Sequence, residues 1–231
     1  MTVLYEDNHL IAVNKTCNEL VQGDKTGDRT LIDEVKAYIK AKYNKPGEVF
    51  LGLPHRIDRP TSGIVLFART SKALVRLNLL FQQHDAIRKT YWAIVQNPPR
   101  EREGQLEHYL IKNEAQNKSY VLTQQQIARG VKGKLARLTY RILSQSDRYT
   151  LLEIHLLTGR HHQIRCQLAS IGCPIKGDLK YGAKRSNPDG GISLHARQIE
   201  FIHPVTRLPL VLTAPVPPDP LWQAFMMSLE S

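Results

Sequence analysis

Residues 54–67, with the sequence PHRIDRPTSGIVLF, constrain the fold of this chain more than any other stretch. The apolar run Ile64–Phe67 follows the tight turn Thr61-Ser62-Gly63, a pattern that predicts a buried strand entered through a stiff corner. Pro60 fixes its own φ and favours extended backbone before it, while the glycine lets another segment approach closely. Asp58 is therefore expected on a preorganised loop at the mouth of a strand, where functional groups concentrate.

The carboxylate of Asp58 lies in sequence between two arginines, Arg56 and Arg59. Neighbouring cations favour the ionised form of an acid, so we expect Asp58 to be charged and available to a ligand. An ordinary surface turn with paired charges explains these residues equally well, because ion pairs are often structural.

Length and composition describe a globular protein with a substantial core. The 231 residues, 42% of them hydrophobic, are enough for one large domain or for two lobes that share a sheet. No apolar run is long enough for a membrane span, and Glu6 and Asp7 stand where a signal peptide would be basic and then apolar. We expect a cytoplasmic protein that does not engage a membrane.

The cysteines and histidines do not favour a metal site. Three cysteines without a C-x-x-C pair suggest neither a disulfide framework nor a zinc site. His161 and His162 are adjacent, and neighbouring residues of a helix point in different directions, which argues against joint ligation.

Positive charge is concentrated in one part of the chain. Of a net charge of +11, most comes from residues 129–185, which hold twelve Lys or Arg against three acidic residues. Such a cluster predicts a polyanionic partner, with a generally basic surface as the plainer alternative.

Hydrophobic patterning predicts alternating strands and helices in an α+β fold. The segment 113–134 is polar and reads either as an excursion that closes on a ligand or as an idle connection. Strands are predicted at 3–5, 10–14, 63–69, 89–96, 105–112, 135–144, 149–157, 193–201 and 208–212, and helices at 30–43, 70–83, 159–170 and from 219.

Three motifs in order resemble the RluA branch of the pseudouridine synthases, enzymes that isomerise uridine in RNA. They are His55-Arg56-Ile57-Asp58-Arg59-Pro60-Thr61-Ser62-Gly63, Leu157-Thr158-Gly159-Arg160-His161-His162-Gln163-Ile164-Arg165, and Gly177-Asp178-Leu179-Lys180-Tyr181-Gly182. Ile57 replaces the usual leucine, and Lys15-Thr16-Cys17-Asn18 departs from the Lys-Pro-x-Gly that the family often carries in its first loop. The similarity extends over nearly the whole chain.

The resemblance implies the pseudouridine synthase fold: a central, mixed but mostly antiparallel sheet flanked by helices, with a catalytic cleft across the sheet. Residues 1–231 would form a single catalytic domain, without the S4-like module that many relatives carry before it. We expect a monomer that needs no cofactor and no metal.

The resemblance also implies the roles of individual residues. Asp58 would be the catalytic carboxylate and Arg165 its ionic partner. Tyr91, in Lys89-Thr90-Tyr91-Trp92-Ala93, would lie against the base, although strand periodicity alone favours a core aromatic. The chemical path of the isomerisation is left open by residue types.

RNA, either rRNA or tRNA, would be the partner. The target nucleotide must leave its stack, and Arg56 would fill the vacated space. Arg160 and the basic stretch 129–137 would hold phosphates, and His55 and His162 would add further RNA contacts. The rival functions are a non-catalytic RNA-binding protein, which needs no carboxylate at 58, and an RNA glycosidase that releases uracil.

Overall fold

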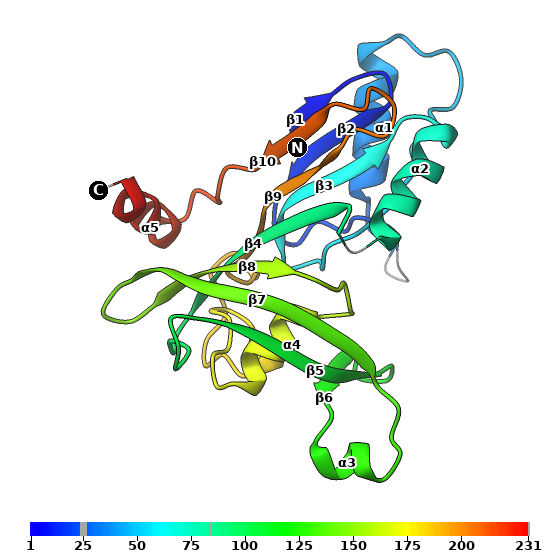
Figure 1. Cartoon of the computed structure of the whole chain (residues 1–231). Coiled ribbons are helices and arrows are strands. Elements are labelled where there is room, and N and C mark those ends of the chain that lie inside the picture. The colour runs from blue at the N-terminus through cyan, green and yellow to red at the C-terminus, as the bar shows by residue number, and fades with distance from the viewer. Residues whose placement is uncertain (24–26, 84, 231) are drawn as a thin grey trace. The chain divides into compact units, whose positions relative to one another are not determined.

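The computed structural model describes residues 1–23, 27–83 and 85–230 as two compact units (Figure 1). The first unit comprises residues 1–89 and 196–217, and the second comprises residues 90–195 and 218–231. Strands β4 (Ile87–Val95) and β9 (Leu194–Ile202) each have residues in both.

The first unit is a strand layer with two helices. Its strands follow the order β1-β2-β3-β9, with β10 paired to β9, and the pairs β1·β2, β2·β3 and β9·β10 are antiparallel. Its elements are β1 (Thr2–Glu6), β2 (Leu10–Lys15), α1 (Leu31–Lys42), β3 (Ser62–Ala68), α2 (Ser71–Gln82), part of β9 and β10 (Pro209–Thr213).

Local sequence explains both helices of this unit. Thr30 and Asp33 form a reciprocal capping box at the start of α1, and Thr70 accepts the Ala73 N–H at the start of α2. The predicted apolar face of α1 is buried as expected, at Leu31, Val35 and Ile39. Strand β3 is buried along its whole length, which confirms the predicted central strand.

The second unit is built on the strand order β4-β8-β7-β5-β6, in which β4·β8, β8·β7, β7·β5 and β5·β6 are antiparallel pairs. Helix α4 packs on β5 and β6, and helix α5 packs on β7. Its elements are part of β4, β5 (Glu103–Asn113), β6 (Lys118–Val121), α3 (Gln124–Ala128), β7 (Lys134–Gln145), β8 (Thr150–Leu156), α4 (Gln163–Ser170), the 3-10 helix η1 (Leu179–Tyr181) and α5 (Pro220–Glu230).

The predicted α+β class, with a mostly antiparallel sheet and flanking helices, is confirmed. Two predictions need correction. The excursion 113–134 contains strand β6 and helix α3, and α4 begins at Gln163, not at 159, because His162 adopts a left-handed conformation with φ 51°.

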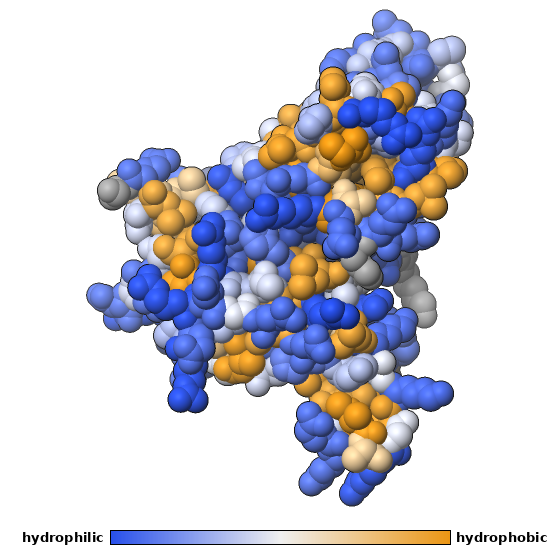
Figure 2. All heavy atoms as spheres, viewed as in Figure 1, coloured by the Kyte–Doolittle hydropathy of each residue, from blue (hydrophilic) through white to orange (hydrophobic). Residues whose placement is uncertain are grey.

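Each unit has its own apolar core. In the first, residues of β2, β3, α2, β9 and β10 pack together around Leu66 and Leu77. In the second, residues of β4, β7, β8 and α4 pack around Leu138 and Leu152. Hydrophilic side chains predominate on the face shown in Figure 2. A group of apolar atoms, surrounded by hydrophilic ones, lies over the excursion that carries α3. No helix in the described ranges has the length and apolarity needed to cross a membrane.

Candidate active-site elements

The loop that carries Asp58 is closed by its own backbone. The Thr61 N–H donates to the Asp58 carbonyl at 3.0 Å, and the chain then enters buried β3. Gly63 has φ +112°, and a Cβ there would collide with the backbone of Ala196 in β9. Only glycine fits this corner, so the close packing of β3 on β9 fixes where the preceding loop begins.

Lys15, at the end of β2, supports the same loop from the interior. Its ammonium donates to the carbonyls of Thr16 at 2.8 Å and Arg59 at 2.9 Å, and the residue is only 1% exposed. Burial lowers the Lys15 pKa to about 8, although the nearby carboxylates of Glu19 and Asp58 act in the opposite direction. The first loop of this chain departs from the family pattern but keeps its lysine, which stabilises the backbone at Arg59, the residue after Asp58.

The two arginines beside Asp58 differ in their surroundings. The Arg59 side chain turns to the first loop, where Nε donates to the Asn18 carbonyl at 3.2 Å and Nη2 pairs with Asp28 at 3.1 Å. Arg56 is exposed. Arg56 thus stays available for the predicted contact with RNA, whereas Arg59 fastens the loop.

His55 has structural contacts. Its Nε2 accepts the Leu66 N–H at 2.9 Å, and its ring stacks on Phe81 with the centroids 4.6 Å apart. Desolvation, followed by the charge of Lys89, lowers its pKa to about 3. A neutral ring engaged in this way offers no cation to a phosphate, so the geometry does not favour the RNA contact predicted for His55.

In the second unit, the second and third motifs meet around Arg165 of α4. The guanidinium binds Asp178 through two hydrogen bonds, Nε to Oδ2 at 2.7 Å and Nη2 to Oδ1 at 2.9 Å, and lies 5.1 Å from the centre of the Tyr181 ring. Both charged side chains are almost fully buried, 6% and 1% exposed. A bidentate pair of this kind holds the guanidinium in one orientation.

His162 belongs to the same network. Its Nδ1 lies 3.0 Å from the Tyr181 hydroxyl, and its ring stacks on that of His161. Burial, with the Arg165 charge as the next cause, lowers the His162 pKa to about 2, and burial raises the pKa of Tyr181. His162 is therefore a neutral interior residue, and its predicted RNA contact finds no support in this geometry.

Tyr91 and Arg160 are both half-buried in this unit. Tyr91, in β4 opposite Ile154, is half-buried against the core, which is consistent with either interpretation of its pattern. Arg160 donates from Nε to the Leu135 carbonyl at 2.9 Å, and its N–H donates to Gln163 Oε1 at 2.9 Å. Its guanidinium is thus anchored at one nitrogen.

The predicted catalytic residues are divided between the units: Asp58 belongs to the first, and Tyr91 and Arg165 belong to the second. Their joint action stays a prediction. Sequence reasoning gave no role to Lys15, Asp178 or Tyr181, although the first-loop lysine and the third motif had marked all three positions.

The described residues contain no group of three or more His, Cys, Asp or Glu side chains suited to a metal ion. Cys17, Cys166 and Cys173 form no disulfide within the described ranges, and burial raises the Cys166 pKa to about 11.

Comparison with known proteins agrees with the motifs. The model of the family described as RNA pseudouridylate synthase matches residues 9–170. The chain belongs to this family. The match includes the first two motifs and extends into both compact units.

Several bacterial members of the RNA pseudouridylate synthase family are similar along most of this chain. The ribosomal large subunit pseudouridine synthase C of Vibrio vulnificus is 31% identical over 93% of the chain, which spans 65% of that protein. The tRNA pseudouridine synthase C of Vibrio cholerae is 30% identical over 98% of the chain and 94% of its own length. The chain thus spans about two thirds of several of its curated relatives and nearly all of another.

A solved structure, human RNA pseudouridylate synthase domain containing 4, matches with a TM-score of 0.77 over 99% of this chain and 93% of its own, at 22% identity. This similarity establishes that the chain has the pseudouridine synthase fold.

Proposed function

We propose that this chain converts uridine to pseudouridine in RNA, with Asp58 as its catalytic carboxylate. The observation that carries the proposal is the corner at Gly63, where glycine-only packing presents a motif aspartate at the entrance of a buried strand. A binding protein that reads only charge and shape has no need for such a rigid backbone next to one motif aspartate.

The isomerisation of uridine requires few groups besides correctly positioned charges. The bond between ribose C1′ and uracil N1 breaks, the base turns, and a bond forms between C1′ and C5. C5 loses its hydrogen as a proton, and N1 gains one. No electrons are exchanged with an outside partner, so an ionised carboxylate and groups that orient the base are sufficient.

We propose Arg165 as the cation that faces Asp58 and Tyr91 as the residue against the base. The ion pair with Asp178 supports the first assignment, because it holds the Arg165 guanidinium in one orientation. The guanidinium is also shielded from water, a setting in which opposite charges attract each other more strongly. The position of Tyr91 beside the core supports the second, since a packed ring is a rigid surface for a flat base. Arg56 and Arg160 are the proposed RNA contacts.

We further propose that the two compact units form one catalytic domain, because the family match crosses their boundary. The substrate class is rRNA or tRNA. Relatives named for each are almost equally similar to this chain, at 31% and 30% identity.

The test uses purified protein and uridine-containing RNA tritiated at C5, without added cofactor. We expect wild type to release tritium to water, Asp58→Ala to release none, and Asp147→Ala, an exposed carboxylate in the β7–β8 turn, to match wild type. RNA binding without release from either rRNA or tRNA would favour a non-catalytic binding protein. Free uracil in the supernatant would identify a glycosidase.

A further inference from the structure

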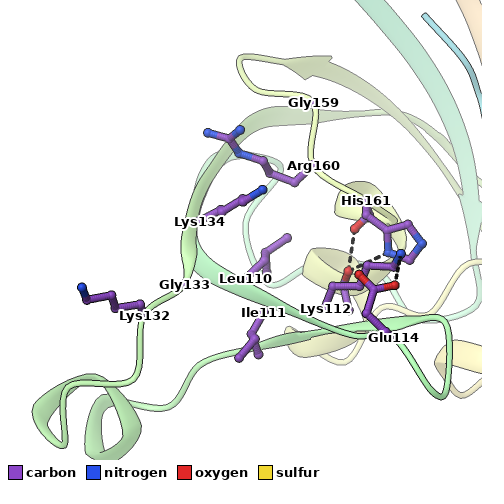
Figure 3. Close-up of a pocket in the computed structure, with 11 residues that line it drawn as sticks. Leu110, Ile111, Lys112, Glu114, Lys132, Gly133, Lys134, Gly159, Arg160 and His161 are labelled. Atoms are coloured by element: carbon purple, nitrogen blue, oxygen red, sulfur yellow. Dashed lines mark hydrogen bonds and ion pairs between the residues drawn. The ribbon is translucent and has the colours of Figure 1, made fainter.

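A cavity of about 310 Å³ lies in the second unit, among the end of β5, the start of β6, the start of β7 and the loop before α4 (Figure 3). This size is at the lower end of the range for small-ligand sites and is enough for part of a nucleotide. Its lining consists of Leu110, Ile111, Lys112, Glu114, Ser119, Lys132, Gly133, Lys134, Gly159, Arg160 and His161.

The cavity has one strongly basic wall. Lys134 and Arg160 lie on the same side in Figure 3, and the Arg160 Nε is bound to the carbonyl of the residue after Lys134. Lys132 stands at the rim, with its side chain directed away from the other labelled residues. Within the part of the chain that the structure describes, no ion pair with a carboxylate is formed by Lys132, Lys134 or Arg160.

The opposite wall is different. There Lys112 pairs with Glu114 at 2.5 Å, and His161 is engaged with Ser119 and Asn117. These groups already satisfy one another, so the charge available to a ligand belongs to the Lys134–Arg160 side. The apolar side chain of Leu110 lies between the two walls in Figure 3.

The backbone around Gly133 maintains this arrangement. A Cβ on Gly133 would approach a terminal methyl of Leu122 to 2.8 Å and the Tyr109 Cβ to 3.0 Å, so glycine avoids crowding where the chain returning from α3 packs against β5. Lys132 and Lys134 flank that glycine and are thereby placed at the mouth and on the wall of the cavity.

We propose that this cavity binds a backbone phosphate of the RNA substrate. The proposal rests on the proposed function and names where the substrate backbone is held. Arg160 presents its two terminal nitrogens, because Nε is already bound, and a guanidinium fork with an adjacent ammonium matches a phosphodiester. The excursion 113–134 is thus an RNA-binding element and not an idle connection.

The test is the affinity of the full chain for fluorescein-labelled oligouridylate, measured by anisotropy over a range of salt concentrations. Each phosphate contact with single-stranded RNA contributes about 0.7 to the slope of log affinity against log salt. Lys134→Gln should therefore bind about fivefold more weakly at 0.1 M salt, with the slope reduced by about 0.7. Circular dichroism and the unfolding midpoint establish that the variant is folded.

Two further variants make the comparison specific. Arg148→Gln removes one exposed charge in the turn at the opposite end of β7 and should bind like wild type. Glu114→Gln removes the single carboxylate of the cavity and frees Lys112, so it should bind RNA more tightly. Loss of a carboxylate strengthens RNA binding on any basic surface, so the gain supports the proposal only if it exceeds that of Asp147→Ala, which removes an exposed carboxylate outside the cavity; equal gains would overturn it.

Equal weakening by Lys134→Gln and Arg148→Gln would mean that only total charge matters, and wild-type affinity for Lys134→Gln would also overturn the proposal. If Lys134→Gln lost binding of uridine monophosphate but kept its RNA affinity, the cavity would take free nucleotides instead. Tritium release is measured in parallel. Its absence from wild type would refute the proposed function, whereas the binding comparison of the variants would still test the phosphate site.

Discussion

Replacing Asp178 by Asn is the most informative perturbation of the network in the second unit. The change keeps the shape of the side chain but removes its negative charge. In the wild type, that carboxylate accepts two short hydrogen bonds from Arg165, at 2.7 and 2.9 Å. The pair is 6% and 1% exposed, so water cannot replace the lost partner. Breaking a buried ion pair on one side destabilises by about 3–5 kcal/mol, because the remaining charge is left in a poorly solvated place.

We expect the lower end of that range, about 3 kcal/mol, because the Asn Oδ1 can still accept one hydrogen bond from the guanidinium. The free energy of unfolding is measured by urea titration. The control is Glu107→Gln, which breaks the exposed Arg137–Glu107 pair at 3.5 Å between β7 and β5 and should change stability by less than about 1 kcal/mol.

A double-mutant cycle separates the pair from its surroundings. Arg165→Met should cost less in the Asp178→Asn background than in wild type, since the charge that it removes has already lost its partner. A loss below about 1 kcal/mol for Asp178→Asn, equal to that of Glu107→Gln, would refute the reasoning that burial makes this pair decisive.

Two further predictions concern the first unit. Gly63→Ala should destabilise by more than about 2 kcal/mol in urea titration, because φ +112° and the Ala196 backbone leave no room for a Cβ; a change within about 0.5 kcal/mol would contradict the packing described. For Lys15, a folded-state pKa of about 8 means that the unfolded chain holds the proton at higher pH than the folded chain, so stability rises with pH above about 8. Between pH 8 and 9.5 this contributes about 1.5 kcal/mol, which should disappear in Lys15→Met; superimposable pH curves for the two proteins would show that Lys15 does not titrate in this window.

Sequence patterns predicted those elements in which the hydrophobic periodicity and the capping residues indicate the same helix or strand. Helix α1 is an example: the spacing of Leu31, Val35 and Ile39 marks its buried face, and Thr30 marks its start. Helix α3 was missed although Thr123 and Gln126 form a capping box, which is a recognisable signal, because only five residues follow the cap. Strand β6, with four residues, is too short for alternation to be visible.

Tertiary packing decided what sequence could not. The side chain of Arg59 lies beside Asp58 in sequence but pairs with Asp28, and Arg165 binds Asp178 thirteen positions away. A motif marks these positions, but the identity of a charge partner depends on which segments the fold brings together. Sequence spacing carries that information only within single helices and hairpins.

Several side chains of the second motif serve to build the turn before α4. Thr158 and the Arg160 N–H both donate to Gln163 Oε1, so the Gln163 side chain closes the turn before α4. His162 is turned inward by its left-handed backbone and binds Tyr181. Because these residues satisfy one another, Arg160 extends into the basic cavity while Arg165 points into the buried network. A single well-packed turn therefore directs two arginines, five residues apart, into different surroundings: Arg160 into the lining of the cavity and Arg165 into the buried pair.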